Sequence, residues 1–334
     1  MSGPGSGLGP VVRLAPAKLN LTLAIVGRRP DGYHALHSVM APLGLADRLS
    51  LALAAGREDT LFVSGDDVDR ASLGPPADNL VLRAIAAART ALGGGLPAPA
   101  LAARLEKRIP VAAGLAGGSS DAAAAFDGAL EAWGAGGTSV LSAEERLRVA
   151  ARLGSDVPFF LAGGLALVEG RGERVAPLPG AINGPPPGIL LVVPRLGVPT
   201  PAVFAAYAAS GAAINGATRL TSEHLAGELQ RGLTAKVLHD RAAILASAND
   251  LAPASAIVVP AIVPFRRALA RLTGRPVGLS GSGPSLWVLY PTLASAEAAA
   301  SVVGRALDDG SLLAPGDGRP FVAATPIVAE PVPR

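Results

Sequence analysis

The chain has 334 residues, half of them hydrophobic, a formal net charge of +3 and no cysteine. This length predicts two domains with sizeable cores, and the lack of cysteine excludes disulfides and thiolate metal sites. No apolar stretch reaches the about 18 residues that span a bilayer, and the first residues lack the pattern of a signal peptide, so we expect a cytoplasmic protein without membrane association.

The charge pattern favours a small anionic partner over nucleic acid. Aromatic residues make up only 4% of the chain, and no dense block of basic residues appears, whereas nucleic-acid binding usually needs both. Among the 29 basic residues only Lys18, Lys107 and Lys236 are lysines. A lysine in such an arginine-rich chain indicates a position that needs a compact, movable ammonium group.

The first half of the chain predicts strands followed by helices. Residues 1–10 are predicted to form a flexible tail. Strands are predicted at 11–25 with a break at Pro16, at 34–53 as two strands separated by Gly44 and Asp47, and at 100–109, with a turn at 28–33. Helices are predicted at 79–92, capped by Asp78 or Asn79, at 119–133, and from Ser142, where Glu145 completes a capping box, to about Gly154.

The second half mixes the same two kinds of element. Residues 170–188 are dense in glycine and proline, so we predict domains at 11–175 and 176–334. A buried strand is predicted at 189–193, a hairpin-like pair around 280–284 and a final strand at 321–329, with helices between them. Strands mixed with helices in both halves predict an α+β fold.

The most informative segment is PVAAGLAGGSSDAAAA at 110–125. Glycines and small residues lead into Ser119, Ser120 and Asp121, which cap helices well, and into alanines, which propagate them. A helix N-terminus after a glycine-rich loop is a ready site for phosphate. The alternative is a small-residue loop packed under a helix. The spacing matches neither a P-loop nor a dinucleotide fingerprint.

Two further segments carry groups suited to phosphoryl transfer, which needs a phosphate cradle and a group that orients or deprotonates the attacking hydroxyl. Lys18 and Asn20 share one face of a strand, which is either an exposed face or a functional one. Asp156 precedes an apolar Val-Pro-Phe-Phe run and is either a helix cap or a carboxylate at a cleft edge that accepts a proton.

Two turns also have a plain and a functional interpretation. Asp31-Gly-Tyr33-His34 is either a surface turn or an aromatic platform suited to a nucleobase. The glycine-rich segment 279–284 is either a tight turn between strands or a second loop that closes over the same phosphates.

In this order the motifs PAKLNLTL, DGYHAL, DNLVLRA, the loop at 110–121, LGSDVPFF, PTPAVF and LSGSGPS resemble the GHMP kinases (galactokinase, homoserine kinase, mevalonate kinase and relatives). PAKLNL with GYH resembles, within them, the branch that phosphorylates a cytidine diphosphate-linked methylerythritol. The resemblance covers about residues 11–290. It implies two α+β domains with the active site in the cleft between them. The loop departs from the glycine-richest versions at Ala112, Ala113 and Ala116, where alanine is tolerable only if φ stays negative.

The resemblance also implies roles for individual residues. Asp156 is expected to take the proton of the 2-hydroxyl, with Lys18 as its partner. Substrate contacts are expected at Asn20, Tyr33, His34, Thr200 and Phe204. ATP contacts are expected at Asn79, Lys107, Pro110, Ala113, Gly114, Leu115, Ala116, Gly117, Gly118, Ser119, Ser120, Asp121, Gly281, Ser282 and Gly283, with Ser120 also touching Mg²⁺. Asp121 stands where relatives often have Asn, and it either faces Mg²⁺ or caps the helix.

The expected cofactors are therefore ATP and Mg²⁺, and the expected partner is the small cytidine substrate. We expect no binding of nucleic acid, and we expect the chain to be a monomer or a weak homodimer. The nearest alternative is another GHMP kinase of the homoserine or mevalonate type, which should lack the pair PAKLNL and GYH. A non-catalytic nucleotide sensor is a second, although it would need neither Lys18 nor Asp156. A nucleotide-sugar oxidoreductase is a third, without a dinucleotide fingerprint.

Overall fold

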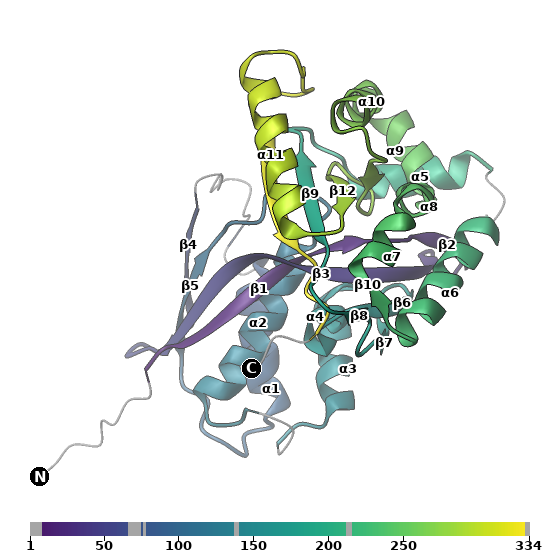
Figure 1. Ribbon diagram of the computed structural model, residues 1–334. Helices are drawn as coiled ribbons and strands as arrows, with labels where there is room; N and C mark the ends of the chain where they lie inside the picture. Colours follow the sequence, from purple (N-terminus) through teal and green to yellow (C-terminus); the bar gives the residue numbers. More distant parts are fainter. Residues whose placement is uncertain (1–8, 66–74, 76–77, 137–139, 212–215, 331–334) are drawn as a thin grey trace, which may run out of the picture. The chain divides into compact units, whose positions relative to one another are not determined.

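The computed structural model describes residues 9–65, 75, 78–136, 140–211 and 216–330 (Figure 1). Helices and strands are mixed in both halves of the chain, so the predicted α+β class is confirmed. Of the predicted tail, residues 1–8 lie outside the described residues, and Gly9 and Pro10 are exposed. None of the helices formed by the described residues combines the length and apolar character needed to cross a bilayer.

The chain forms two compact units that alternate along the sequence. The first comprises Met1–Pro16, Ala46–Ile109 and Gly117–Leu161, and the second comprises Ala17–Leu45, Pro110–Ala116 and Ala162–Arg334. The predicted domains, 11–175 and 176–334, are instead two consecutive segments of the chain. The predicted domain boundary near residue 175 stays a prediction.

The first unit packs helices on a small sheet. In it the C-terminal part of β3 (His34–Leu53) pairs with β5 (Leu101–Glu106), and β5 pairs with β4 (Thr60–Ser64). The helices are α1 (Leu80–Ala91), α2 (Gly117–Ala132), α3 (Ala143–Leu153) and α4 (Val157–Ala162). The alanine face of α2 allows close packing on α1, and both helices contribute to one buried core with Phe126 and Leu130. The predicted caps are confirmed: Asn79 caps α1, and Ser142 with Glu145 forms a capping box at α3.

The second unit contains two larger sheets, one two-stranded sheet and the remaining helices of the described residues. The N-terminal part of β3 pairs with β2 (Ala24–Arg28) and with β6 (Ala166–Gly170), and β6 pairs with β7 (Arg174–Pro177). The other sheet has the order β11-β12-β9-β13, with β11 (Gly278–Leu279), β12 (Leu286–Tyr290), β9 (Gly188–Val193) and β13 (Phe321–Pro326). Every residue of β9 is buried, as its sequence GILLVV predicts.

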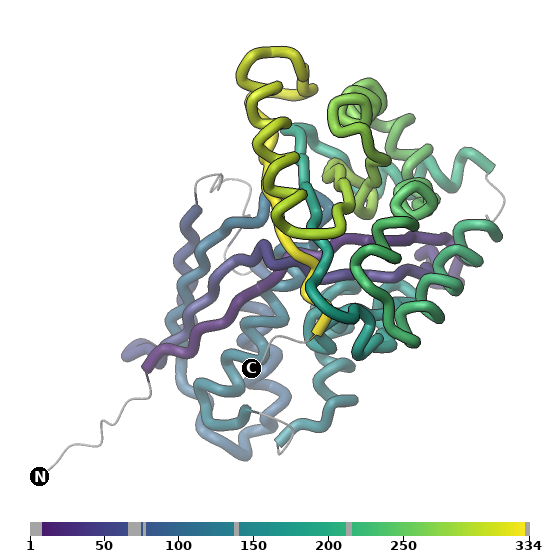
Figure 2. Tube along the Cα trace, in the orientation of Figure 1, coloured from purple at the N-terminus to yellow at the C-terminus, as the bar shows by residue number. Residues whose placement is uncertain are grey.

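Helices cover the second sheet and flank it. The tube in Figure 2 follows α11 (Leu293–Asp308) along β9 and β13, and α10 (Ile262–Thr273) adds Phe265 and Leu269 to the same core. The remaining elements of this unit are α5 (Thr200–Ala209), α6 (Gly216–Gln230), α7 (Ala235–Asp240), α8 (Ala242–Ser247), α9 (Ala252–Val258), β8 (Ile182–Asn183) and β10 (Leu233–Thr234).

Two predicted strand breaks are wrong. β1 (Val11–Asn20) runs through Pro16 without interruption. Its recorded pairing within the described residues is with β3 alone, and a proline without an N–H is tolerated on such an edge strand. β3 likewise runs through Gly44 and Asp47 as one strand. A Cβ on Gly44 would lie 2.9 Å from Cδ of Pro326, so this glycine permits a close approach by the end of β13 rather than a turn.

Candidate functional site

The two predicted glycine loops lie against each other in the second unit. Ser285 donates to the carbonyl of Ala113 from its backbone N at 3.3 Å and from Oγ at 2.6 Å, and Oγ of Ser280 donates to the carbonyl of Gly114 at 3.2 Å. The backbone N of Lys18 donates to the carbonyl of Leu115 at 3.0 Å. The turn at 280–285 joins the antiparallel strands β11 and β12, as predicted, and it also holds the loop at 110–116 in shape.

Two of the alanines of this loop do not have the negative φ at which alanine is readily tolerated. Ala112 and Ala116 both have φ of +55°, where an alanine costs about 1–2 kcal/mol relative to the right-handed region. Ala113, Gly114 and Leu115 lie between these two alanines, and the hydrogen bonds to their carbonyl groups stabilise this path. A loop held in a costly backbone conformation is typical of a binding site.

Gly114→Ala is expected to lower the free energy of unfolding by about 1–3 kcal/mol. Gly114 has φ of +76°, and a Cβ there would lie 2.7 Å from the carbonyl oxygen of Gly283 and 2.9 Å from that of Ser280. Urea unfolding measures the loss. Gly27→Ala is the matched control, because a Cβ at Gly27 meets nothing within 4 Å; equal stability of the two variants would contradict the prediction.

The loop leads directly into α2, which begins at Gly117, two residues earlier than predicted. Its first turn carries the small residues expected at a phosphate site. Oγ of Ser120 and Oδ1 of Asp121 are buried and have no hydrogen-bond partner among the described residues. A buried oxygen without a partner costs free energy unless a ligand satisfies it. Together with the free N–H groups of a helix N-terminus, this first turn has the donor and acceptor set of a phosphate and metal contact.

Lys107 lies between two buried carboxylates in the first unit. Its Nζ pairs with Asp47 and, at 2.7 Å, with Oδ2 of Asp121. Burial lowers the pKa of Lys107, but the carboxylates of Asp121 and Asp47 outweigh it and raise that pKa overall. Asp47 also accepts from the backbone N–H groups of Arg108 at 2.5 Å and Ile109 at 2.8 Å. Asp47 therefore belongs inside β3 as a fully bonded carboxylate, and Asp121 is an ion-pair partner of Lys107.

The free energy of unfolding of the native chain is expected to fall between about pH 4 and pH 7, and Asp121→Asn is expected to abolish this fall. Burial, which the neighbouring Asp47 reinforces, raises the pKa of Asp121 from 3.8 to about 7. The folded chain then binds more protons than the unfolded chain across this interval, so its free energy of unfolding falls as pH rises through it. Urea unfolding from pH 5 to pH 8 measures the slope. Asp309 is exposed, so Asp309→Asn should keep the native dependence of the unfolding free energy on pH. An unchanged dependence in Asp121→Asn would contradict the prediction.

Lys18 and Asn20 are buried, which excludes the exposed-strand interpretation. Their side chains are 5% and 2% exposed, and Nζ of Lys18 donates to Oδ1 of Asn20 at 2.8 Å. A Cβ on Gly281 would lie 3.7 Å from that Oδ1 and 4.0 Å from that Nζ. The second glycine loop therefore passes beside both groups, within the same unit.

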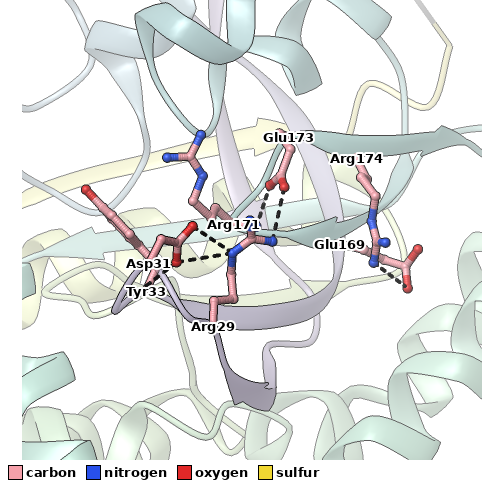
Figure 3. A network of polar contacts seen from close by, with 7 residues as sticks. All are labelled: Arg29, Asp31, Tyr33, Glu169, Arg171, Glu173 and Arg174. Atoms are coloured by element: carbon pink, nitrogen blue, oxygen red, sulfur yellow. Dashed lines mark hydrogen bonds and ion pairs between the residues drawn. The ribbon is translucent and has the colours of Figure 1, made fainter. Parts of the chain in front are cut away.

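Tyr33 and His34, the two rings predicted to form an aromatic platform, lie in different surroundings. Tyr33 is exposed in the turn between β2 and β3, and the guanidinium of Arg171 lies 5.4 Å from the centre of its ring (Figure 3). The turn is held by Arg29, which binds Asp31 and Glu173. This leaves Tyr33 as an exposed ring with one cationic neighbour.

His34, by contrast, is already engaged within the protein. Its ring stacks on Phe204 at 5.3 Å between centroids with 25° between planes, and Tyr207 meets it edge-on at 5.8 Å. Burial lowers the pKa of His34, and the charge of Arg28 lowers it further. A neutral imidazole with one donor and one acceptor nitrogen can read a polar base edge. The predicted Thr200 lies at the start of α5, where Oγ1 is 2.9 Å from Oγ of Ser282 in the second glycine loop.

Two predicted residues occupy the ends of helices in the first unit. Asn79 accepts from the backbone N of Val81 through Oδ1 and so caps α1. Asp156 is half-buried in the short connection between α3 and α4, directly before Val157. Lys18 belongs to the second unit and Asp156 to the first.

Sequence reasoning missed Arg171 beside Tyr33 and the structural role of Asp47. It also missed Ser38, which accepts from Nδ2 of Asn20 at 2.8 Å. Arg171 is one arginine among many, and the partners of Asp47 lie about 60 positions away along the chain. Local spacing carries no signal for either contact.

Comparisons with known proteins identify the family of the chain. The family description "GHMP kinases N terminal domain" matches residues 79–164, and "GHMP kinases C terminal" matches residues 229–309. A 4-diphosphocytidyl-2-C-methyl-D-erythritol kinase of Pelotomaculum thermopropionicum is 38% identical over 87% of this chain and 93% of its own length.

Solved structures give the same result. The crystal structure of a 4-(cytidine 5'-diphospho)-2C-methyl-D-erythritol kinase superposes with a TM-score of 0.64 at 30% identity, covering 94% of this chain and 99% of that one. A homoserine kinase from Cytophaga hutchinsonii superposes with a TM-score of 0.67 at 17% identity, covering 99% of this chain and 98% of that one, which shows a shared fold alone. The chain belongs to the 4-diphosphocytidyl-2-C-methyl-D-erythritol kinases of the GHMP family, which are ATP-dependent kinases of small molecules.

Proposed function

We propose that the protein transfers the γ-phosphate of ATP to the 2-hydroxyl of 4-diphosphocytidyl-2-C-methyl-D-erythritol, giving the 2-phosphate and ADP in the non-mevalonate route to isoprenoid precursors. The observation that carries the proposal is the buried pair Lys18–Asn20 beside Gly281 of the second glycine loop, which itself holds the loop at 110–116. The names of the relatives supply the substrate.

Within this proposal the two charged residues have separate tasks. Asp156 accepts the proton of the attacking 2-hydroxyl as a general base. Lys18 stabilises the negative charge that develops on the hydroxyl oxygen and on the transferring phosphoryl group. Asn20 orients the methylerythritol end of the substrate.

The proposed ATP contacts are the loop at 110–116, the first turn of α2 and the glycines at 281 and 283. Backbone N–H groups of the loop and helix bind the phosphates. Ser120 fits a contact to Mg²⁺, because its buried Oγ has no partner in the part of the chain that the structure describes, and Mg²⁺ in kinases takes few protein ligands besides phosphate oxygens. When bound, Mg²⁺ would neutralise negative charge on the phosphates. Asn79 and Lys107 are proposed on the adenosine side.

The test is ADP release from ATP and Mg²⁺ by the purified protein, with diphosphocytidyl-methylerythritol, homoserine and mevalonate offered in parallel. Turnover with the cytidine compound alone supports the proposal. Turnover with homoserine or mevalonate instead would keep the kinase chemistry and overturn the substrate, and ATP binding without turnover of any acceptor would overturn the reaction.

Tyr33→Ala is expected to raise KM for the cytidine substrate about tenfold or more, with little change in KM for ATP. Stacking of a base on an aromatic side chain contributes about 1–3 kcal/mol, and Tyr33 is an exposed ring on the proposed cytosine side. Steady-state kinetics with each substrate varied in turn measures both constants. Phe62→Ala removes an equally exposed ring of β4 and should leave both unchanged; an equal effect of Tyr33→Ala on the two substrates would contradict the cytosine assignment.

A further inference from the structure

An unbroken line of hydrogen bonds begins at Lys18 and stays within the second unit. Nζ of Lys18 donates to Oδ1 of Asn20 at 2.8 Å, and Nδ2 of Asn20 donates to Oγ of Ser38 at 2.8 Å. Oγ of Ser38 then donates to the backbone carbonyl of Thr22 at 2.6 Å. Ser38 is on β3 and fully buried, and Lys18 and Asn20 are almost so.

Which group donates each hydrogen bond in this line follows from the last acceptor, the carbonyl of Thr22. The carbonyl of Thr22 can only accept, so it takes the hydroxyl proton of Ser38. Oγ of Ser38 must then accept from Asn20, and the only donor on an amide side chain is its NH₂ group. This turns Oδ1 of Asn20 toward Lys18, whose ammonium can only donate. Without the hydroxyl of Ser38, the ammonium of Lys18 alone selects the orientation of the amide, so the amide is held less firmly and turns its NH₂ group toward the ammonium more often.

We propose that Ser38 is a positioning residue for the ammonium of Lys18, and that it acts by fixing which end of the Asn20 amide faces it. The kinetic consequence rests on the proposed function, since it assumes that Lys18 takes part in phosphoryl transfer. The consequence for the ammonium itself rests only on the hydrogen bonds. A misplaced ammonium would stabilise the transition state less well, while ATP and substrate would still bind.

The structure supplies a matched control in Ser222 of α6. Ser222 is a serine as fully buried as Ser38. Its Oγ accepts from Oγ1 of Thr22 at 2.8 Å and lies 2.9 Å from Nδ1 of His37. It thus belongs to a neighbouring polar network in the same unit but does not touch Asn20. Ser222→Ala removes a buried hydroxyl at the same general cost without freeing the amide.

The kinetic test compares Ser38→Ala with Ser222→Ala. We expect Ser38→Ala to lower kcat about tenfold with KM for ATP unchanged, and Ser38→Thr, which keeps a hydroxyl, to recover most of the loss. Ser222→Ala should keep the native kcat even if both alanine variants lose similar stability in urea. An equal fall in kcat for both alanine variants would make Ser38 merely structural and overturn the proposal.

A second readout follows Lys18 directly. Because the chain has only three lysines, mass spectrometry after brief treatment with an amine-reactive label reports each one separately. We expect Ser38→Ala to speed labelling of Lys18 several-fold, since an amide that turns its NH₂ group toward the ammonium no longer holds it through an acceptor oxygen. Labelling of the exposed Lys236 gives the reference rate, and Ser222→Ala shows how much faster labelling becomes through loosening alone.

The background variant Asn20→Asp isolates the amide. A carboxylate presents an acceptor oxygen to Lys18 in either orientation, so Ser38→Ala should no longer change labelling of Lys18 in this background. The same acceleration there as in the native background would overturn the proposal. If the native chain fails to phosphorylate the cytidine substrate, the proposed function fails, and the labelling experiment still decides the role of Ser38.

Discussion

Asp156→Asn is expected to bind ATP as the native chain does and to lose turnover by a factor of about 10² or more. A positioned general base contributes about 10²–10⁴-fold, and asparagine keeps the shape and hydrogen-bonding of the side chain but cannot take a proton. Calorimetric ATP titration and initial rates with saturating substrates measure the two quantities. The exposed Asp240→Asn, which removes a surface carboxylate paired with Lys236, is the control and should show native turnover.

This substitution also separates the two interpretations of Asp156. The residue directly precedes α4, and asparagine caps helices about as well as aspartate. A residue that only capped the helix would therefore lose little in either stability or rate. Near-normal turnover in Asp156→Asn would remove Asp156 as the base and leave the cap as its role.

Lys107→Met is expected to lower the free energy of unfolding at pH 8 by about 3–5 kcal/mol. Methionine preserves the length and apolar stem of lysine but leaves the carboxylates of Asp47 and Asp121 without their shared cation, and both are buried. Removing one partner of a buried ion pair leaves an uncompensated charge, which is far more costly than losing a surface pair. Urea unfolding with the native chain in parallel measures the loss.

Two companion variants show where that loss comes from. Lys236→Met removes an exposed cation paired with Asp240 and should cost less than about 1 kcal/mol. Adding Asp121→Asn to Lys107→Met removes one of the two stranded carboxylates and should recover part of the stability. If Lys107→Met instead kept native stability and lost only ATP affinity, Lys107 would serve the nucleotide and not the carboxylates.

Local signals in the sequence predicted those parts of the fold that local interactions determine. The caps at Asn79 and Ser142 depend on residues two or three positions away, and both are confirmed. The continuity of β1 and β3 depends on distant residues. Gly44 is explained by Pro326, and Asp47 by Lys107, Arg108 and Ile109. A glycine and an aspartate in a strand pattern therefore look like a turn until their partners are known.

The candidate site shows the same division between local and distant information. The motifs identified Lys18, Asn20, Tyr33 and the glycine loops, and the structure places Lys18, Asn20 and Gly281 within contact distance of one another. The positive φ of Ala112 and Ala116 was not predictable, because the residues that impose the path of their loop belong to another part of the chain. The role of Ser38 was not predictable for the same reason, because it depends on three hydrogen bonds that join separate segments of the chain.

The loop at 110–116 also has a consequence for the order in which the protein acquires its shape. The bond from Ser285 to Ala113 joins residues 172 positions apart. On a ribosome the loop is therefore made long before the segment that holds it, and the alanines at 112 and 116 have nothing to keep them in a costly conformation until β11 and β12 have been synthesised. Closing so long a stretch of chain is slow, so we expect the nascent chain to complete the loop at 110–116 as one of its last steps of folding.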